Sequence, residues 1–96
     1  MKPLPETPDL LRVAQRVVWF KEPREALADP THLLAYAMTY GTIEDIRVLQ
    51  AAVGTNGFRQ ALERAPPGIF DPRSWAYWNL VLGRSPAPPL PRRSIR

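Results

Sequence analysis

Hydrophobic residues recur every three or four positions along most of this chain, which is the spacing of helices with one apolar face. The first such stripe runs from Leu10 to Val17. It follows Thr7-Pro8-Asp9, where a hydroxyl cap, a proline at the first helical position and an acid in the first turn are typical of a helix start. Because the apolar spacing continues to Phe20, we expect a first helix over residues 8–20.

The same start and stop signals divide the rest of the chain into further helical segments. Asp29-Pro30 opens a segment that we expect to end at Gly41, in the left-handed conformation common after helices. Thr42 and Asp45 then form a capping-box pattern, with Asp in place of the usual Glu. These signals predict helices over residues 23–27, 30–40, 42–53, 55–65 and 72–82.

Glycines and prolines separate the later segments from one another. Gly54 lies between two apolar stripes, and Pro66-Pro67-Gly68 excludes helix after the second stripe. The first of these stripes consists of Ile43, Ile46, Leu49, Ala52 and Val53. The second consists of Phe58, Ala61, Leu62 and Ala65.

The fold class follows from this pattern. The period-two alternation typical of half-buried strands does not extend beyond a few residues anywhere in the chain. Its 96 residues suffice for one domain. We therefore predict an all-α fold, a compact single-domain bundle of five to six short helices over residues 8–83. An extended arm would precede it over residues 1–7, and an extended tail rich in proline and arginine would follow over residues 84–96.

Composition indicates where such a protein works. The chain has no cysteine, so we expect neither disulfides nor thiolate chemistry. Met1 to Glu6 does not resemble a signal peptide, and the longest apolar run, Leu33 to Met38, is far shorter than the roughly 20 residues of a membrane helix. These features predict a cytoplasmic protein that is not bound to a membrane.

The positive charge is concentrated in the tail. The net charge is +4 at pH 7. Residues 1–83 hold nine basic and nine acidic residues, whereas residues 84–96 hold four arginines and no acid. Any attraction to nucleic acid that rests on overall charge would therefore come from the tail.

Reactive side chains are few and isolated. His32 is the only histidine, and a position near a helix start disfavours its cationic form. The acidic pairs Glu22/Glu25 and Glu44/Asp45 are explained by the stabilisation of acids in the first turn of a helix. We therefore expect no catalytic, cofactor-binding or metal-binding residues, and a protein that is not an enzyme.

The last predicted helix is apolar on all sides. Trp75 and Trp78 share one face, while Tyr77, Leu80 and Val81 lie on another. Such a helix is expected to be buried, either within the domain or against a second chain, and the sequence leaves both alternatives open. Tryptophan, tyrosine and arginine are the residues most often found as interface anchors. The candidate partner-binding residues of this helix are Arg73, Trp75, Tyr77 and Trp78.

The tail reads Pro86-Ala87-Pro88-Pro89-Leu90-Pro91-Arg92-Arg93, which favours the polyproline II conformation. Pro88, Pro91 and Arg93 match the PxxPx(K/R) pattern of ligands that dock in aromatic grooves. We expect a stiff extension that lies on this domain or on a partner. Arg92 and Arg93 complete the set of candidate partner-binding residues.

Nucleic-acid binding is the alternative. The helices on either side of Gly41-Thr42 are compatible with a helix-turn-helix, in which Arg47 and Gln50 would read bases. The tail arginines would add phosphate contacts. Glu44-Asp45 at the start of the second helix would, however, face phosphates unfavourably.

Two stretches resemble a family of short, uncharacterised bacterial helical proteins. They are Phe70 to Gly83 and Leu33 to Asp45, and the resemblance covers roughly residues 10–83. Members are often encoded beside nucleotidyltransferase-like toxins of the abortive-infection type, which implies an antitoxin or accessory role. The shared motifs are structural, so no site residues carry over. We therefore expect a regulatory protein that binds a protein partner, either a toxin encoded nearby or a second copy of itself.

Overall fold

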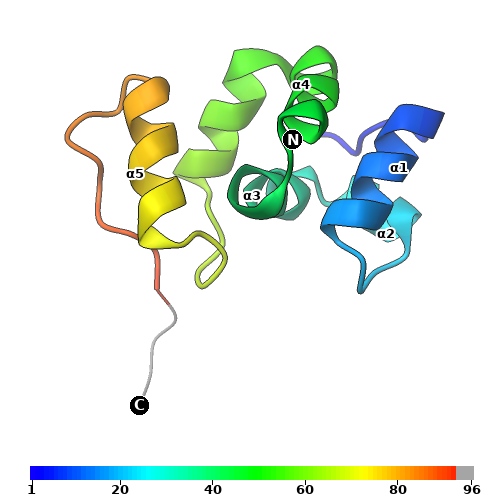
Figure 1. The fold of residues 1–96 in the computed structure, drawn as a ribbon, viewed down its shortest axis with the longest axis horizontal. Helices are drawn as coiled ribbons and strands as arrows, with labels where there is room; N and C mark the ends of the chain where they lie inside the picture. Colours follow the sequence, from blue (N-terminus) through cyan, green and yellow to red (C-terminus); the bar gives the residue numbers. More distant parts are fainter. Residues whose placement is uncertain (93–96) are drawn as a thin grey trace.

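Five α-helices make up the fold in this computed structural model, which describes residues 1–92 (Figure 1). They are α1 (Pro8–Val17), α2 (Pro23–Ala28), α3 (Pro30–Tyr40), α4 (Ile43–Glu63) and α5 (Pro72–Val81). No strand occurs among the described residues. The all-α prediction is confirmed.

Helix α3 is the centre of the molecule. It lies between α1 and α2 on one side and α5 on the other, and it packs against all four other helices (Figure 1). Alanines let the neighbouring helices approach closely, and larger side chains fill the remaining space. The buried hydrophobic side chains of α3 are Leu33, Leu34, Ala35, Ala37 and Met38.

Side-chain caps confirm the predicted starts of α1, α4 and α5. Thr7 and Asp71 accept hydrogen bonds from the backbone N–H groups of Leu10 and Ser74, at 3.3 and 2.7 Å. At α4 the capping box is complete, because Thr42 and Asp45 each accept the other's backbone N–H, at 3.2 and 3.0 Å. Short polar side chains at these positions satisfy N–H groups that have no partner inside the helix.

The expected end of the first helix is wrong by three residues. Helix α1 ends at Val17, and Val18 to Phe20 form a turn instead of a last helical turn. Glu22 is extended because Pro23 follows it, so the chain must leave the helix before that point. The turn leaves Trp19 and Phe20 exposed, although the apolar spacing had predicted Phe20 on the buried face.

The break that the sequence predicted at Gly54 is present, and α4 consists of two helical segments that meet at a kink there. Gly54 adopts φ 67° and ψ 179°, a conformation that is essentially limited to glycine, and α4 bends there (Figure 1). The predicted apolar face of the first half is also partly wrong, because Ile43 is exposed. Asp45 is buried instead, and two positions along a helix are about 200° apart, so burying Asp45 turns Ile43 outward.

Gly41 does not have the expected left-handed conformation. Its φ of −75° and ψ of 164° are extended. The position still requires glycine, because a Cβ atom there would lie 2.6 Å from the carbonyl oxygen of Ala37. Glycine is therefore needed at position 41 because the Ala37 carbonyl lies close to it, and not because the backbone is left-handed.

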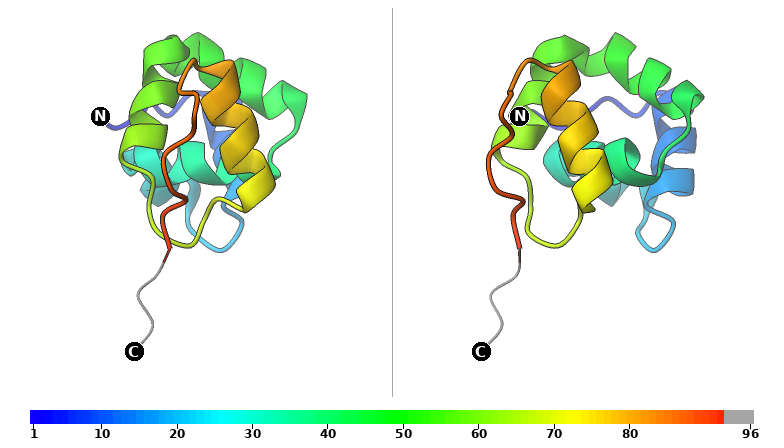
Figure 2. Two further views of the ribbon diagram at one scale, coloured as in Figure 1. Left: turned by 90° about the vertical axis from the view of Figure 1, so that its left-hand side faces the viewer. Right: turned by 60° about the vertical axis from the view of Figure 1, so that its left-hand side comes forward.

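The proline-rich tail, as far as it is described, lies along the domain. It runs back beside α5 and the second half of α4 (Figure 2). The indole N–H of Trp75 donates a hydrogen bond of 2.8 Å to the carbonyl oxygen of Pro88, and Leu90 packs against the core. The sequence left open whether the tail lies on this domain or on a partner. The described part of the tail lies on the domain itself.

Candidate functional site

An apolar groove lies where α3, the start of α4 and α5 meet. We call it the α4–α5 groove, and it has a volume of about 570 Å³. This size is within the range of ligand and side-chain pockets. Its apolar lining includes Met38, Ile43, Ile46, Tyr77 and Trp78. Arg73, Tyr77 and Trp78 all line this groove, so the structure brings three residues of the predicted partner-binding set together.

Both charged residues that line this groove are arginines, Arg47 from α4 and Arg73 from α5. Arg47 is 3.9 Å from Glu44, at the limit of an ion pair, and both side chains are largely exposed. Arg73 forms no ion pair within residues 1–92. The groove therefore combines an apolar lining with positive charge.

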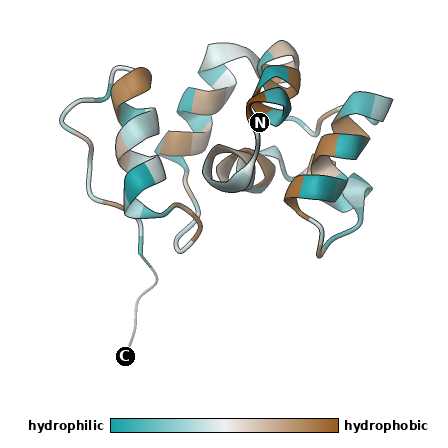
Figure 3. Cartoon of the chain, in the orientation of Figure 1, coloured by the Kyte–Doolittle hydropathy of each residue, from teal (hydrophilic) through white to brown (hydrophobic). Residues whose placement is uncertain are grey.

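The outer face of α5 continues the apolar surface beyond the groove. Within the domain this helix is not buried on all sides, because Tyr77 is 58% exposed, Leu80 is 68% exposed and Val81 is also exposed, and burial of this face against a second chain stays a prediction. Hydrophobic residues reach the last turn of the helix (Figure 3). The covered side of α5 packs against α3, against Phe58 of α4 and against the tail. Arg73, Tyr77, Leu80 and Val81 recur at helical spacing and form a stripe facing solvent.

The two tryptophans of α5 are internal anchors. Trp75 is 5% exposed, packs edge-on against Phe70 and is hydrogen-bonded to the tail. Trp78 is half-buried, stacks on Phe58 and donates its indole N–H to the carbonyl oxygen of Met38 at 2.8 Å. Trp78 thus presents one edge to the groove, whereas Trp75 does not line it.

The remaining predicted residues belong to the tail. Arg92 is exposed and does not line the α4–α5 groove. Arg93 lies outside the described residues.

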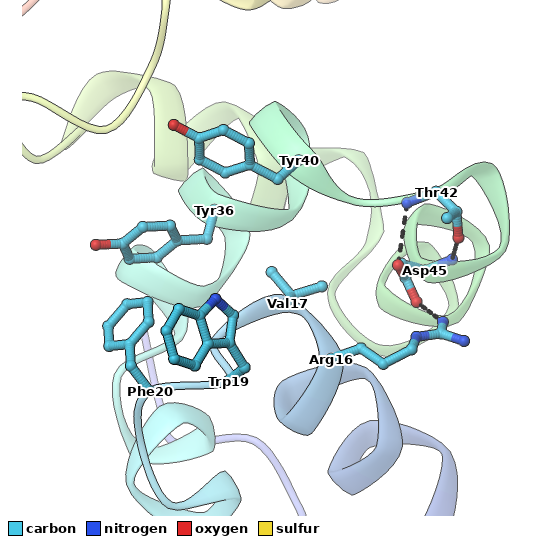
Figure 4. Close-up of a pocket in the computed structure, with 8 residues that line it drawn as sticks. All are labelled: Arg16, Val17, Trp19, Phe20, Tyr36, Tyr40, Thr42 and Asp45. Carbon is cyan, nitrogen blue, oxygen red and sulfur yellow. Dashed lines mark hydrogen bonds and ion pairs between the residues drawn. The ribbon is translucent and has the colours of Figure 1, made fainter.

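A second hollow, which shares Thr42 with the α4–α5 groove, lies between α1, the turn after it, α3 and the start of α4 (Figure 4). We call it the aromatic hollow, and its volume is about 480 Å³. Four rings form a continuous row along it. The contacts are Trp19–Phe20 edge-on at 5.7 Å, Phe20–Tyr36 edge-on at 5.4 Å and Tyr36–Tyr40 stacked at 6.4 Å.

These rings are unusually accessible for their size. Trp19 is 78% exposed and Tyr40 is 68% exposed, and Phe20 also faces solvent. Sequence reasoning missed this cluster because it assigned Trp19 and Phe20 to the end of a helical stripe. The one available signal was Pro23, which forces the chain out of helix shortly after these residues.

An ion pair closes one side of the aromatic hollow. The Arg16 guanidinium of α1 donates to the carboxylate of Asp45, which also accepts the Thr42 N–H (Figure 4). Burial acts to raise the pKa of Asp45, but the Thr42 N–H, the Arg16 guanidinium and the Thr42 hydroxyl outweigh it, so the pKa lies below its usual 3.8. The carboxylate is charged at neutral pH and joins α1 to α4.

The histidine considered for chemistry lines neither hollow. His32 pairs locally with Asp29 at 2.8 Å, and both are exposed. Within residues 1–92, no group of three or more His, Cys, Asp or Glu side chains is placed to hold a metal ion. None of the five described helices has the length and apolar character needed to cross a membrane.

The residues considered for reading bases have local partners as well. Gln50 donates to the Thr55 hydroxyl at 3.3 Å, and Arg47 lies near Glu44. Asp71, at the start of α5, has a lowered pKa because the backbone N–H of Ser74 donates to its carboxylate. Both helix starts beside the α4–α5 groove therefore carry negative charge close to the arginines.

No protein-family model matches this chain, and no curated protein or solved structure is significantly similar to it. The functional proposal therefore depends on the geometry of the two surfaces.

Proposed function

We propose that this protein is a non-enzymatic regulatory protein that binds a protein partner through the α4–α5 groove and the outer face of α5. The observation that supports this most directly is the solvent-facing stripe of Tyr77, Leu80 and Val81 beside an apolar groove. Large apolar patches on small soluble domains commonly mark interaction sites. Aromatic and arginine side chains at such a patch are the residues that usually anchor a partner.

The charge of the groove indicates what the partner presents. Arg47 and Arg73 flank the apolar lining, so a complementary segment would carry apolar residues with carboxylates next to them. An amphipathic helix with one acidic edge meets this requirement. A second copy meets it poorly, because a symmetric contact sets each surface against itself and brings the arginines of both copies into one interface.

The same charges favour a protein partner over nucleic acid at this surface. A phosphate backbone attracts clustered cations that have no acidic neighbours. Here Glu44 and Asp71 sit at the helix starts beside the two arginines. A carboxylate-bearing side chain can approach one arginine while avoiding these acids, whereas a continuous row of phosphates cannot.

The family resemblance suggests an identity for the partner. Under this proposal the protein acts as an antitoxin-like regulator in the cytoplasm, and its partner is a nucleotidyltransferase-type toxin encoded nearby. Occupation of the α4–α5 groove by an acidic segment of the toxin would be the contact that regulates it.

Site-specific photocrosslinking in the native host tests the proposal. A photoreactive phenylalanine analogue at Tyr77 should crosslink to one protein partner, through a segment containing Asp or Glu beside apolar residues. The same analogue at Gln60, an exposed residue that does not line this groove, is the matched control. Equal crosslinking at both positions, or crosslinking of Tyr77 to nucleic acid, would contradict the proposal.

A charge reversal provides the second arm of the test. Arg73→Glu combined with Tyr77→Ala should release the crosslinked partner, with a loss of affinity of at least about thirtyfold if both residues are anchors. Both side chains are exposed, so the variant should retain its helical circular dichroism. If the partner is a toxin, co-expression of this variant should no longer protect growth.

A further inference from the structure

The aromatic hollow contains hydrogen-bond donors that the domain does not use. The structure gives no hydrogen bond to the Trp19 indole N–H or to the hydroxyl groups of Tyr36 and Tyr40 within residues 1–92. In Figure 4 the hydrogen bonds and ion pairs drawn in the hollow join Thr42, Asp45 and Arg16 only. The exposed rings can thus offer apolar faces together with free donors.

The charges around the hollow limit the kind of ligand it can take. Arg16 lines it, which disfavours a free cation between the rings. Its guanidinium is already paired with Asp45, which makes it a poor site for phosphate. The ligand that fits is uncharged where it lies between the rings and rich in hydrogen-bond acceptors. A proline-rich extended segment has this chemistry, because proline has a carbonyl acceptor but no N–H donor.

The chain itself carries such a segment, and it already shows the required contact. In the tail, the carbonyl oxygen of Pro88 accepts the indole N–H of Trp75 at 2.8 Å. This contact uses one edge of the tail, because Pro88, Leu90 and Pro91 are partly buried against the domain. Indole and proline backbone therefore recognise each other within this molecule.

The other edge of the tail is free. Pro86, Pro89 and Arg92 are all exposed, and they are spaced by three residues. A polyproline II helix has three residues per turn, so these side chains lie along one edge. This edge could meet a second surface without breaking the Trp75–Pro88 contact. Pro86 and Pro89 would pack on the exposed rings of that surface.

The described part of the tail lies away from the aromatic hollow of its own molecule. It lies beside α5 and the second half of α4, whereas the hollow is lined by α1, the turn after it, α3 and the start of α4 (Figures 1 and 2). We propose that the aromatic hollow binds the exposed Pro86–Pro89–Arg92 edge of the tail of a second copy of this chain. The contact is head-to-tail, so it joins copies into open chains and does not stop at a symmetric dimer.

Analytical ultracentrifugation of the full-length protein tests this proposal. The weight-average mass should rise with concentration, with a dissociation constant on the order of 100 µM, because small interfaces of this kind are weak. Trp19→Ala combined with Tyr40→Ala should weaken association about thirtyfold, since two exposed aromatic anchors are lost. Replacing Pro86, Pro89 and Arg92 by serine should have the same effect.

Mixing the two variants gives the sharpest result. The hollow variant keeps an intact tail, and the tail variant keeps an intact hollow. Each should be monomeric alone, but together they should form a 1:1 dimer and nothing larger, because only one productive contact remains. A symmetric interface or non-specific association would not produce this outcome.

The control variant is Tyr77→Ala, which removes an exposed aromatic ring from the α4–α5 groove and should leave self-association unchanged. A protein that stays monomeric at millimolar concentration would overturn the proposal. So would a hollow variant that associates like the wild type, or variants that fail to pair when mixed. Should Trp19→Ala impair folding, Tyr40→Ala alone, at a largely exposed position, carries the same test.

Discussion

Replacing Asp45 by asparagine probes the ion pair that joins α1 to α4 beside the aromatic hollow. The substitution keeps the size of the side chain and removes its charge. Asparagine can still accept the Thr42 N–H through its oxygen, so the start of α4 stays capped. Its amide group then faces the Arg16 guanidinium as a second donor, and the bond between the two helices is lost.

The structure sets the size of the effect. A hydrogen bond to a charged group contributes about 1.5–3 kcal/mol when it is shielded from water. Arg16 is 53% exposed and its guanidinium can turn to solvent, so the ion pair should contribute about half of this value. A carboxylate in the first turn of a helix adds about 0.3–1 kcal/mol. We expect Asp45→Asn to lower the free energy of unfolding by about 1–2 kcal/mol at neutral pH.

The dependence on pH has a definite sign. The pKa of Asp45 in the folded protein lies below 3.8, so the unfolded chain binds a proton more readily than the folded one. The stabilisation is therefore complete above the unfolded pKa and is lost as the pH falls through the folded pKa. The difference in stability between wild type and Asp45→Asn should be largest near neutral pH and shrink in acid.

Urea unfolding followed by circular dichroism at several pH values measures this difference. Asp9→Asn is the control, because Asp9 also lies in a first turn and pairs with Arg12, but both side chains are mostly exposed. It should change stability by less than about 1 kcal/mol, and by less than Asp45→Asn does, because its ion pair is exposed. A difference between wild type and Asp45→Asn that stays constant from neutral to strongly acidic pH would refute the assignment to the charged carboxylate.

Three further substitutions test other parts of the fold. Gly54→Ala should cost about 1–3 kcal/mol in urea unfolding although nothing lies within 4 Å of the added carbon, because the strain is in the backbone. Trp75→Phe should accelerate tryptic cleavage of the tail by releasing Pro88, whereas Trp78→Phe, which also loses one indole hydrogen bond, should not. Asn79→Leu should leave the unfolding midpoint unchanged or raise it, since the Asn79 side-chain oxygen is buried without a partner within residues 1–92, while Asn79→Asp should cost about 3 kcal/mol.

Local signals in the sequence predicted the helix starts well. Thr7, Thr42 and Asp71 act through hydrogen bonds within three residues, so the information is contained in the sequence around them. The same holds for the break at Gly54, where the two predicted helical segments meet at a kink.

The sequence predicted less well which side of each helix faces the core and which residues are buried, because both depend on contacts between distant segments. Ile43 was expected in the core and is exposed, since the buried position belongs to Asp45, whose partner Arg16 lies 29 residues away. Trp19 and Phe20 were assigned to a helix, and the aromatic hollow was missed. It exists because α3 brings Tyr36 and Tyr40 to the turn after α1, which no local pattern reveals.

The three tryptophans show why the exposed surface differs from the one expected. An indole is buried favourably when its N–H finds an acceptor. Trp75 and Trp78 have backbone carbonyl groups as acceptors, from Pro88 and Met38, and both hold the fold together. Trp19 has no acceptor within residues 1–92 and remains 78% exposed. The indole that is free for a partner is thus the one with no internal acceptor. A peptide carbonyl group of another chain would supply the acceptor that the Trp19 N–H lacks.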